Sequence, residues 1–283
     1  MGRCTLAHQG VRRASVDEMR QRLTQPGSTL DLYTWVAEGN DGEIVGFGQV
    51  WSESPHTEVV SYVRVDPEHR GRGIATALLD RGASRATDLA PPETALHATS
   101  WPRDEAAAPL LEASGFAPLR YLSLMTVELD EQPEEPVWPP DVRVAPLDSE
   151  SEIRPAFDAR TAVFDDRADM GEWLHEYVGG GFDPTLWFVA EDEQGIAGFA
   201  FCLPELSEDP EAGYVSELGV RHDRRGEGLG LALLRRTFVE FRRRGKARVS
   251  LHVDTDNLTG AVRLYTRAGM TPDPRVVVWE RRP

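Results

Sequence analysis

The sequence repeats itself, and this repeat restricts the possible folds more than any other feature. Residues 65–79 match residues 220–234 at a constant offset of 155, with the Val, Arg, two Gly, Ala and two Leu positions identical. The pair Leu-His recurs at the same offset, at 96–97 and 251–252. A register held over this length indicates a duplicated domain.

An acidic, proline-rich segment separates the two copies. Residues 131–141 contain four prolines and hold neither a helix nor a central strand. We therefore predict an N-terminal domain over 1–130, a linker over 131–141 and a C-terminal domain over 142–283. The first copy has only residues 16–23 to match the opening part of the second, so we expect it to be truncated at its start.

Composition restricts the partners. The 283 residues include 47 acidic and 31 basic side chains, a formal net charge of −16 at pH 7. Such a surface repels nucleic-acid phosphates, and no apolar run is long enough to cross a membrane. The two cysteines form no paired motif, and the seven histidines show no metal-ligand spacing. We expect a cytoplasmic monomer or homodimer with no metal, nucleic-acid or membrane partner.

Both copies show the same order of predicted elements: three strands, an amphipathic helix, a strand, a short helix and a last strand. In the first copy the strands are predicted near 32–37, 44–51, 59–65, 96–100 and 122–129, and the helices near 74–86 and 104–113. In the second they lie near 186–191, 196–203, 214–220, 248–253 and 276–279, with helices near 229–243 and 258–268, and a strand at 142–145 and helices at 152–163 and 171–178 ahead of them. This order predicts an α/β fold of the α+β type, with a mixed, mostly antiparallel sheet and helices on both faces of each copy.

The repeated segment joins a strand to a helix through a turn rich in Arg and Gly. The first N–H groups of a helix lack internal partners, and the helix dipole adds positive potential there. Gly73 and Gly228 stand at this helix start, and Arg70 and Arg225 add positive charge beside it. The combination suits a diphosphate group, while a turn that only starts a core helix is the alternative interpretation.

These two turns resemble the acetyl-CoA-binding motif of the GCN5-related N-acetyltransferase (GNAT) family, Arg-x-x-Gly-x-Gly/Ala. Arg70-x-x-Gly73-x-Ala75 and Arg225-x-x-Gly228-x-Gly230 both match it. The tandem arrangement and the ending of the second copy are similar to the mycothiol synthase family. The resemblance implies two tandem GNAT domains with acetyl-CoA as co-substrate. It also implies that the fourth strand bulges and diverges from the fifth to admit the pantetheine arm.

The resemblance also implies which residues contact acetyl-CoA. Backbone groups of the fourth strand would pair with pantetheine, and the N–H of Leu218 would polarise the thioester carbonyl. The implied contact residues are Leu218, Val220, Arg225, Gly226, Gly228, Leu229, Gly230 and Asn257 in the second copy, and Val63, Val65, Arg70, Gly71, Gly73 and Ala75 in the first.

The family's usual proton donor is present in the second copy alone. This donor is a tyrosine four residues before the glycine of the last motif, which is Tyr265 here and Leu111 in the first copy. The family's Asn is Asn257 in the second copy but Pro102 or Arg103 in the first. The resemblance therefore implies catalysis in the second copy, while the first is structural or binds acetyl-CoA without turnover. A Tyr265 that only packs is the alternative.

The residue that accepts the amine proton is a separate question, since the attacking amine must be neutral. Glu217, on the strand before the turn, is the best-placed carboxylate, with Asp254 and Glu211 as alternatives. The mycothiol synthase family has its glutamate three residues earlier, where this chain has Tyr214. Strand alternation places residue 217 on the face opposite to 214, unless a bulge rotates it.

We predict an N-acetyltransferase that moves the acetyl group of acetyl-CoA to a primary amine of a small molecule by direct attack. An acetyl-CoA-binding regulatory or scaffold protein without turnover is the alternative. A nucleotide-dependent oxidoreductase is disfavoured, because Thr76 and Leu231 replace the third glycine of G-x-G-x-x-G. His97 and His252 recur within predicted strands and are interpreted as structural. The sequence does not identify the acceptor.

Overall fold

A computed structural model describes residues 30–52, 57–102, 104–129, 132–147, 150–179, 183–206, 209–254, 260–272 and 276–283. The predicted opening segment 16–23 and the predicted site residue Asn257 lie outside them. The chain forms two compact units. The first unit comprises Met1–Leu122, Gly171–Gly179 and Arg275–Pro283, and the second comprises Ser123–Met170 and Gly180–Pro274.

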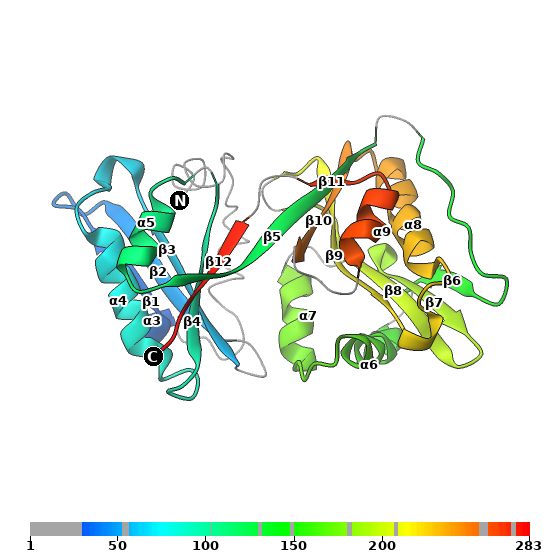
Figure 1. The fold of residues 1–283 in the computed structure, drawn as a ribbon, viewed down its shortest axis with the longest axis horizontal. Coiled ribbons are helices and arrows are strands. Elements are labelled where there is room, and N and C mark those ends of the chain that lie inside the picture. Colours follow the sequence, from blue (N-terminus) through cyan, green and yellow to red (C-terminus); the bar gives the residue numbers. More distant parts are fainter. Residues whose placement is uncertain are drawn as a thin grey trace. The chain divides into compact units, whose positions relative to one another are not determined.

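The sheet of the first unit has the strand order β1-β2-β3-β4-β12-β5 (Figure 1). Strands β3 and β4 pair in parallel, and the other neighbours pair antiparallel. The strands are β1 (Thr34–Glu38), β2 (Ile44–Trp51), β3 (Glu58–Val65), β4 (Ala95–Ser100), β12 (Val276–Arg281) and β5 (Ala117–Glu128). The helices in this part of the chain are α3 (Leu30–Tyr33), α4 (Ile74–Ala86), α5 (Ala107–Ala113) and α7 (Met170–Gly179).

The sheet of the second unit begins with the C-terminal half of β5 and continues in the order β10-β9-β8-β7-β6, with β11 paired to β5. Strands β9 and β10 pair in parallel, as β3 and β4 do in the first unit. The strands are β6 (Arg143–Pro146), β7 (Phe188–Asp192), β8 (Gly195–Leu203), β9 (Ala212–Val220), β10 (Arg248–Asp254) and β11 (Thr271–Pro272). The helices are α6 (Ile153–Phe164), α8 (Leu229–Arg243) and α9 (Ala261–Arg267).

Helices cover both faces of the second sheet, as predicted. Alternate residues of β8 point to opposite faces. Ala200 packs in a cluster with Leu233 of α8, whereas the ring of Phe199 meets the ring of Phe164 of α6 edge-on, with centroids 5.8 Å apart. Strand β8 is buried on both sides for this reason, which explains its almost continuous apolar sequence. The α+β fold with mixed, mostly antiparallel strand pairing and packed helices is confirmed.

Strand β12, at the end of the chain, completes the sheet of the first unit. It pairs with β4 on one side and with the N-terminal half of β5 on the other. The compact units therefore do not follow the order of the chain, because the last strand of the second copy belongs to the first unit. The limits drawn from the sequence at 130 and 142 remain a proposal for how the two copies divide.

Strand β5 is longer than predicted. The sequence predicts a strand near 122–129, but β5 starts at Ala117. Residues 117–121 are exposed and show no alternation of buried and exposed positions. Their extended conformation comes from pairing with β12, which is about 160 residues further along the chain. A local pattern carries no information about such a partner.

We expect Trp279→Ala to lower the free energy of unfolding by about 3–5 kcal/mol, the usual cost of removing a buried Trp. Trp279, on β12, is 4% exposed and packs with Leu96 and Phe116. Its Nε1–H donates to Ser100 Oγ at 2.8 Å. Urea denaturation followed by circular dichroism measures the loss. Trp279→Phe, which keeps most of the packing, is the matched control and should cost less; equal costs would contradict the packing argument.

Candidate functional site

Each Arg- and Gly-rich turn ends in a glycine that caps a long helix. Gly73 precedes α4 with φ 76°, and Gly228 precedes α8 with φ 89°. Gly71 and Gly226 also have positive φ, at 73° and 84°. A Cβ added at any of the four would meet no atom within 4 Å, so backbone conformation rather than crowding requires glycine. Such a turn directs backbone N–H groups into one concavity, which suits a diphosphate.

The second turn keeps one arginine available for an anion. Arg221 and Arg224 bind Asp192 of β7 at 2.7 and 2.6 Å. The hydrogen bond from Arg221, reinforced by Arg224, lowers the pKa of Asp192 to about 2, although burial opposes the shift. Arg225 is exposed, donates from Nε to the carbonyl of Val220 at 3.1 Å, and forms no ion pair within the described chain. Two arginines thus fix the turn, and the third faces solvent.

Beside the second turn, the parallel strands β9 and β10 separate. They pair only from Ala212 to Tyr214. Strand β9 also contains a bulge at Ser216, since Phe201 of β8 faces Glu217 while the next residue of β8 faces Val215. The bulge and the divergence that the resemblance implies are both present. Leu218 and Val220 follow the bulge, on the part of β9 that leaves β10.

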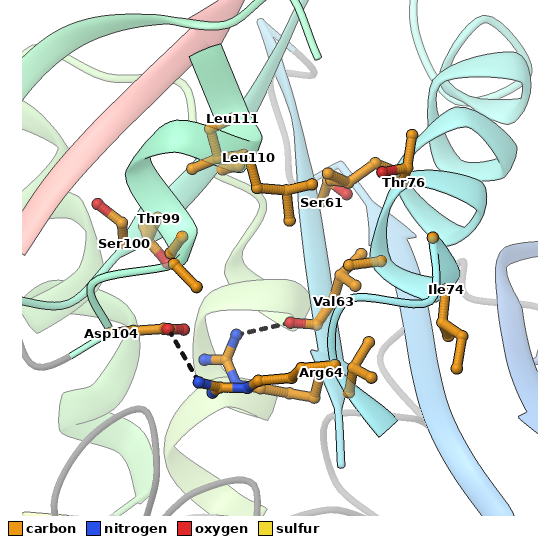
Figure 2. Close-up of a pocket in the computed structure, with 18 of the residues that line it drawn as sticks. Ser61, Val63, Arg64, Ile74, Thr76, Thr99, Ser100, Asp104, Leu110 and Leu111 are labelled. Atoms are coloured by element: carbon orange, nitrogen blue, oxygen red, sulfur yellow. Dashed lines mark hydrogen bonds and ion pairs between the residues drawn. The ribbon is translucent and has the colours of Figure 1, made fainter. Parts of the chain in front are cut away.

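The first unit has the divergence but not the bulge. Strands β3 and β4 pair from Glu58 to Val60 only, and the β2–β3 ladder runs without a register shift. A cavity of about 360 Å³ lies where β3 and β4 separate. Figure 2 shows Ser61 and Val63 of β3 on one side of it, with residues of β4 and α5 opposite. Its lining includes the predicted contact residues Val63, Val65, Arg70, Gly71, Gly73 and Ala75.

Two of the groups implied to bind acetyl-CoA in the first copy are occupied by the chain itself. Arg70 forms an ion pair of 3.5 Å with Asp104, whose side chain is 3% exposed. Arg64 donates to the carbonyl of Val63 at 2.8 Å (Figure 2). A carboxylate beside the first turn disfavours a second anion there. The two turns are alike in backbone but different in charge.

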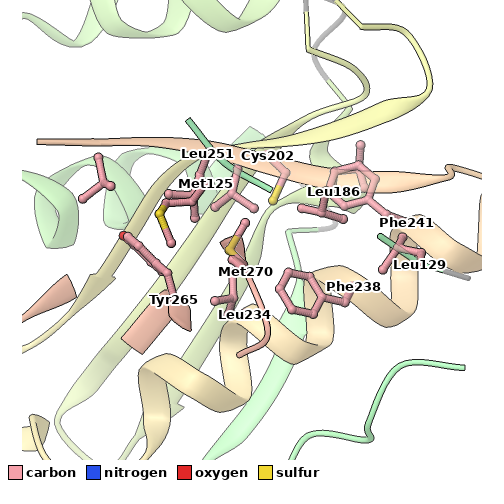
Figure 3. Packing of buried hydrophobic residues seen from close by; sticks show 13 residues of the cluster. Met125, Leu129, Leu186, Cys202, Leu234, Phe238, Phe241, Leu251, Tyr265 and Met270 are labelled. Atoms are coloured by element: carbon pink, nitrogen blue, oxygen red, sulfur yellow. The ribbon is translucent and has the colours of Figure 1, made fainter. Parts of the chain in front are cut away.

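Tyr265, the predicted proton donor, lies on α9 at the edge of the main core cluster of the second unit. Its side chain packs with Met125, Leu234 and Met270 and is 8% exposed. Figure 3 shows its hydroxyl pointing away from Met270 and Leu234. Burial raises the pKa of Tyr265, so the phenol holds its proton at neutral pH. Both the packing interpretation and the catalytic one fit this position.

The corresponding position in the first copy, Leu111, is buried and lines the cavity of the first unit. A leucine offers no proton.

Glu217, the predicted proton acceptor, is held by an arginine. Arg160 of α6 donates from Nε to both carboxylate oxygens, at 3.0 and 3.2 Å, and also binds Asp166. A cation at this distance stabilises the carboxylate and reduces its affinity for a proton. Asp254 ends β10, and Glu211 lies at the opposite end of β9, beside Arg248. The choice among the three carboxylates remains a prediction.

A tyrosine–histidine pair on the diverging strands was not recognised as a site from the sequence. Tyr214 Oη lies 3.1 Å from His252 Nδ1, and the two rings meet edge-on. Tyr214 belongs to the last paired position of β9, and His252 is two residues past that position on β10. The departure from the family at 214 was the available signal, but the separation of 38 positions along the chain hid the contact.

The remaining predicted residues frame the start of α8. Leu229 is buried, and Leu218 packs against the clusters on the α8 side of the sheet. A Cβ at Gly230 would lie 3.2 Å from Leu264 and 3.5 Å from Val220. The small residue at 230 therefore lets α8 approach α9 and β9, and Ala75 shows that the first copy accepts a methyl group at the same place.

Within the described residues, no group of three or more His, Cys, Asp or Glu side chains is placed to hold a metal ion. The described helices also include none that is long and apolar enough to span a bilayer.

Comparisons with known proteins give one consistent result. The profile of the Acetyltransferase (GNAT) family matches residues 150–270, and that of the Acetyltransferase (GNAT) domain matches residues 31–118. The chain is 30% identical to the mycothiol acetyltransferase of Geodermatophilus obscurus over 99% of its own length and 91% of the relative's. It is also 30% identical to that of Cellulomonas flavigena, over 94% and 79% of the two chains.

Solved structures agree. A GCN5-related N-acetyltransferase from Sphaerobacter thermophilus superposes with a TM-score of 0.81 at 29% identity, over 100% of this chain and 90% of that one. A tandem GNAT protein from the clavulanic acid biosynthesis pathway superposes with a TM-score of 0.74 at 18% identity, over 98% and 90%, and supports the fold alone.

The contrast between the two turns predicts that Asp104→Asn strengthens the binding of CoA to the first unit. In a protein whose second turn carries Gly228→Glu, removing the carboxylate beside Arg70 should tighten CoA binding on the order of tenfold, or about 1.4 kcal/mol. Calorimetry measures the change. Glu105→Gln, next along the chain and exposed, is the charge-matched control. An equal gain from the control would show a general charge effect instead.

Proposed function

The chain belongs to the acetyltransferase (GNAT) family, and from that premise we propose that its second copy acetylates a primary amine of a small molecule. Acetyl-CoA-dependent acetyl transfer is the activity of the family. The observation that supports the second copy is the combination around α8: a glycine-capped helix, an exposed arginine and a bulged strand that leaves its parallel neighbour.

Acetyl-CoA supplies an activated thioester and a diphosphate by which it is held. The N–H groups from Gly226 to Gly230 and the guanidinium of Arg225 fit the diphosphate. Backbone groups of Leu218 and Val220 fit the pantetheine arm, and the Leu218 N–H stabilises negative charge on the carbonyl oxygen during direct amine attack. Tyr265 gives its proton to the departing thiolate.

The acceptor is a small-molecule amine of the kind that the curated relatives' name indicates. Those relatives are named mycothiol acetyltransferases, and the similarity extends over nearly the whole of this chain. We propose the deacetylated, amine form of mycothiol as the acceptor to test. The strongly acidic surface suits a substrate that arrives as an ammonium ion.

The first copy is proposed to bind CoA weakly and not to turn it over. It retains the cavity and the glycine-capped helix, but it has Leu111 in place of a phenol, and Asp104 occupies its arginine. The alternative for the entire chain is a regulatory or scaffold role that binds acetyl-CoA without turnover. Absence of acetyl transfer by the intact protein would favour this alternative.

Tyr265→Phe should lower kcat by about 100-fold while the affinity for acetyl-CoA stays unchanged, because the ring is kept and one proton donor is lost. Release of free CoA thiol measures kcat, and calorimetry measures the affinity. Leu111→Phe is the matched control in the first copy and should leave kcat as it is. Full activity in Tyr265→Phe would favour the packing interpretation of this residue.

Gly228→Glu should abolish acetyl transfer. It should also abolish acetyl-CoA binding at the second copy, which is the tighter of the two proposed sites. The substitution forces a side chain onto φ 89° and places a carboxylate at the diphosphate position. Gly73→Glu, the equivalent change in the first copy, should keep the activity. Calorimetry measures acetyl-CoA binding and thiol release measures activity in both variants. Loss of activity in Gly73→Glu, with activity kept in Gly228→Glu, would assign catalysis to the first copy.

A further inference from the structure

The second sheet presents a group of polar side chains on the face that α6 covers. Leu251 and Val253 of β10 and Val215 of β9 point to the opposite face, where they join the α8 and α9 core. His252 and Tyr214 alternate with these residues and therefore point to the α6 face. The half-buried pair stands where the two parallel strands separate.

With the pantetheine arm proposed to lie between β9 and β10, the Tyr214–His252 pair stands at the start of the opening that would hold the thioester. The diphosphate cradle is at the N-terminus of α8, and the residues of β9 that follow the bulge pack on the α8 side. His252 lies about 7 Å beyond the last paired position, and Leu218 lies about 10–13 Å beyond it in the same direction, at about 3.3 Å per residue.

We propose that His252, oriented by Tyr214, takes the proton from the acceptor's ammonium group before its nitrogen attacks the thioester. The inference rests on the proposed function of the second copy. In this arrangement His252 Nδ1–H donates to Tyr214 Oη, and Nε2 is the proton acceptor. The hydrogen bond fixes the tautomer, as the partner of one ring nitrogen fixes the role of the other.

The proton and electron balance of the transfer closes with these groups. The C–N bond forms as the C–S bond breaks, and the departing sulfur receives the proton of Tyr265. Two protons leave the acceptor nitrogen in total. His252 takes the first and releases it to solvent, and the second replaces the one that Tyr265 gave up.

The electrostatics of this face favour His252 over Glu217. Burial lowers the pKa of His252 from its ordinary value of 6.5, so the imidazole is neutral and able to accept a proton at pH 7. Among the described residues, the charged groups on this face include Arg160, Glu217 and Asp166 on or near α6 and β9, Asp254 and Arg248 on β10, and Glu128, Asp209 and Glu211 beside Arg248. Glu217 is already bound by Arg160, and Glu128 is bound by Arg248.

The first copy provides an internal comparison. His97 stands at the position of His252, but its Nδ1 lies 2.7 Å from Glu58 and its Nε2 lies 3.7 Å from Glu280 of β12. Carboxylates at both ring nitrogens hold this histidine within the sheet. At Nδ1 the second histidine has the phenol of Tyr214 where the first has the carboxylate of Glu58.

The test measures kcat/KM for the deacetylated amine of mycothiol from pH 6 to pH 10, with acetyl-CoA saturating. His252→Gln should lower kcat/KM about 100-fold at pH 7. The deficit should shrink as the pH rises through the pKa of the amine, since free amine needs no base. His97→Gln, the matched control, should stay within about twofold of the wild type at every pH. Thermal unfolding and acetyl-CoA calorimetry check that the variants fold and bind.

Two further variants keep the result decisive. Glu217→Gln tests the rival base, and a pH-dependent deficit there, with a uniform one in His252→Gln, would overturn the inference. Tyr214→Phe conserves the packing, so it replaces His252→Gln if that variant fails to fold. It should lower the rate near neutrality and shift the imidazole titration observed by NMR. An active wild type with unaffected His252 and Tyr214 variants contradicts this inference alone, whereas an inactive wild type contradicts the proposed function.

Discussion

The central constraint in this protein is the early end of a hydrogen-bond ladder between two parallel strands. In each unit the parallel pair holds for three positions and then opens. Backbone N–H and C=O groups beyond that point lose their sheet partner, and buried groups of this kind need another one. In the second unit, β9 also contains a bulge at Ser216. The bulge shifts the register of β9 and rotates the residues that follow it. The opening turns the interior of a sheet into a binding surface, and the glycine-capped helix beside it supplies the charge.

Duplication has placed this device in the chain twice, but the surrounding side chains differ. The first unit has an open cavity, yet Asp104 and Arg64 bind the groups that a CoA molecule would use. The second unit has an exposed Arg225, a phenol at 265 and a polar pair on the diverging strands. The two copies therefore share the glycine-capped turn and the divergence of the parallel strands, while the bulge, the exposed arginine and the phenol are found in the second. On this difference rests the proposal that the second copy carries the reaction.

Features with a local cause were predictable from the sequence, and features that join distant segments were not. The limits of α4 and α8 agree with those predicted, at 74–86 and 229–243, since a glycine start and an apolar face are local signals. The start of β5 was wrong because its partner β12 is far along the chain. The partners of Glu217 and Arg70 were hidden for the same reason, since Arg160 is 57 residues away and Asp104 is 34 residues away.

The position of Tyr214 connects these points. A glutamate there would itself be a proton acceptor, whereas a phenol with an ordinary pKa near 10 holds its proton at neutral pH. Replacing one with the other removes a base from β9 without removing the need for one. In the proposed mechanism, a histidine on the neighbouring strand, within hydrogen-bond distance of that phenol, takes over this role. The histidine recurs at 97 in the first copy, where Val59 stands at the position of Tyr214, so the tyrosine is the difference that gives the second histidine its phenol partner.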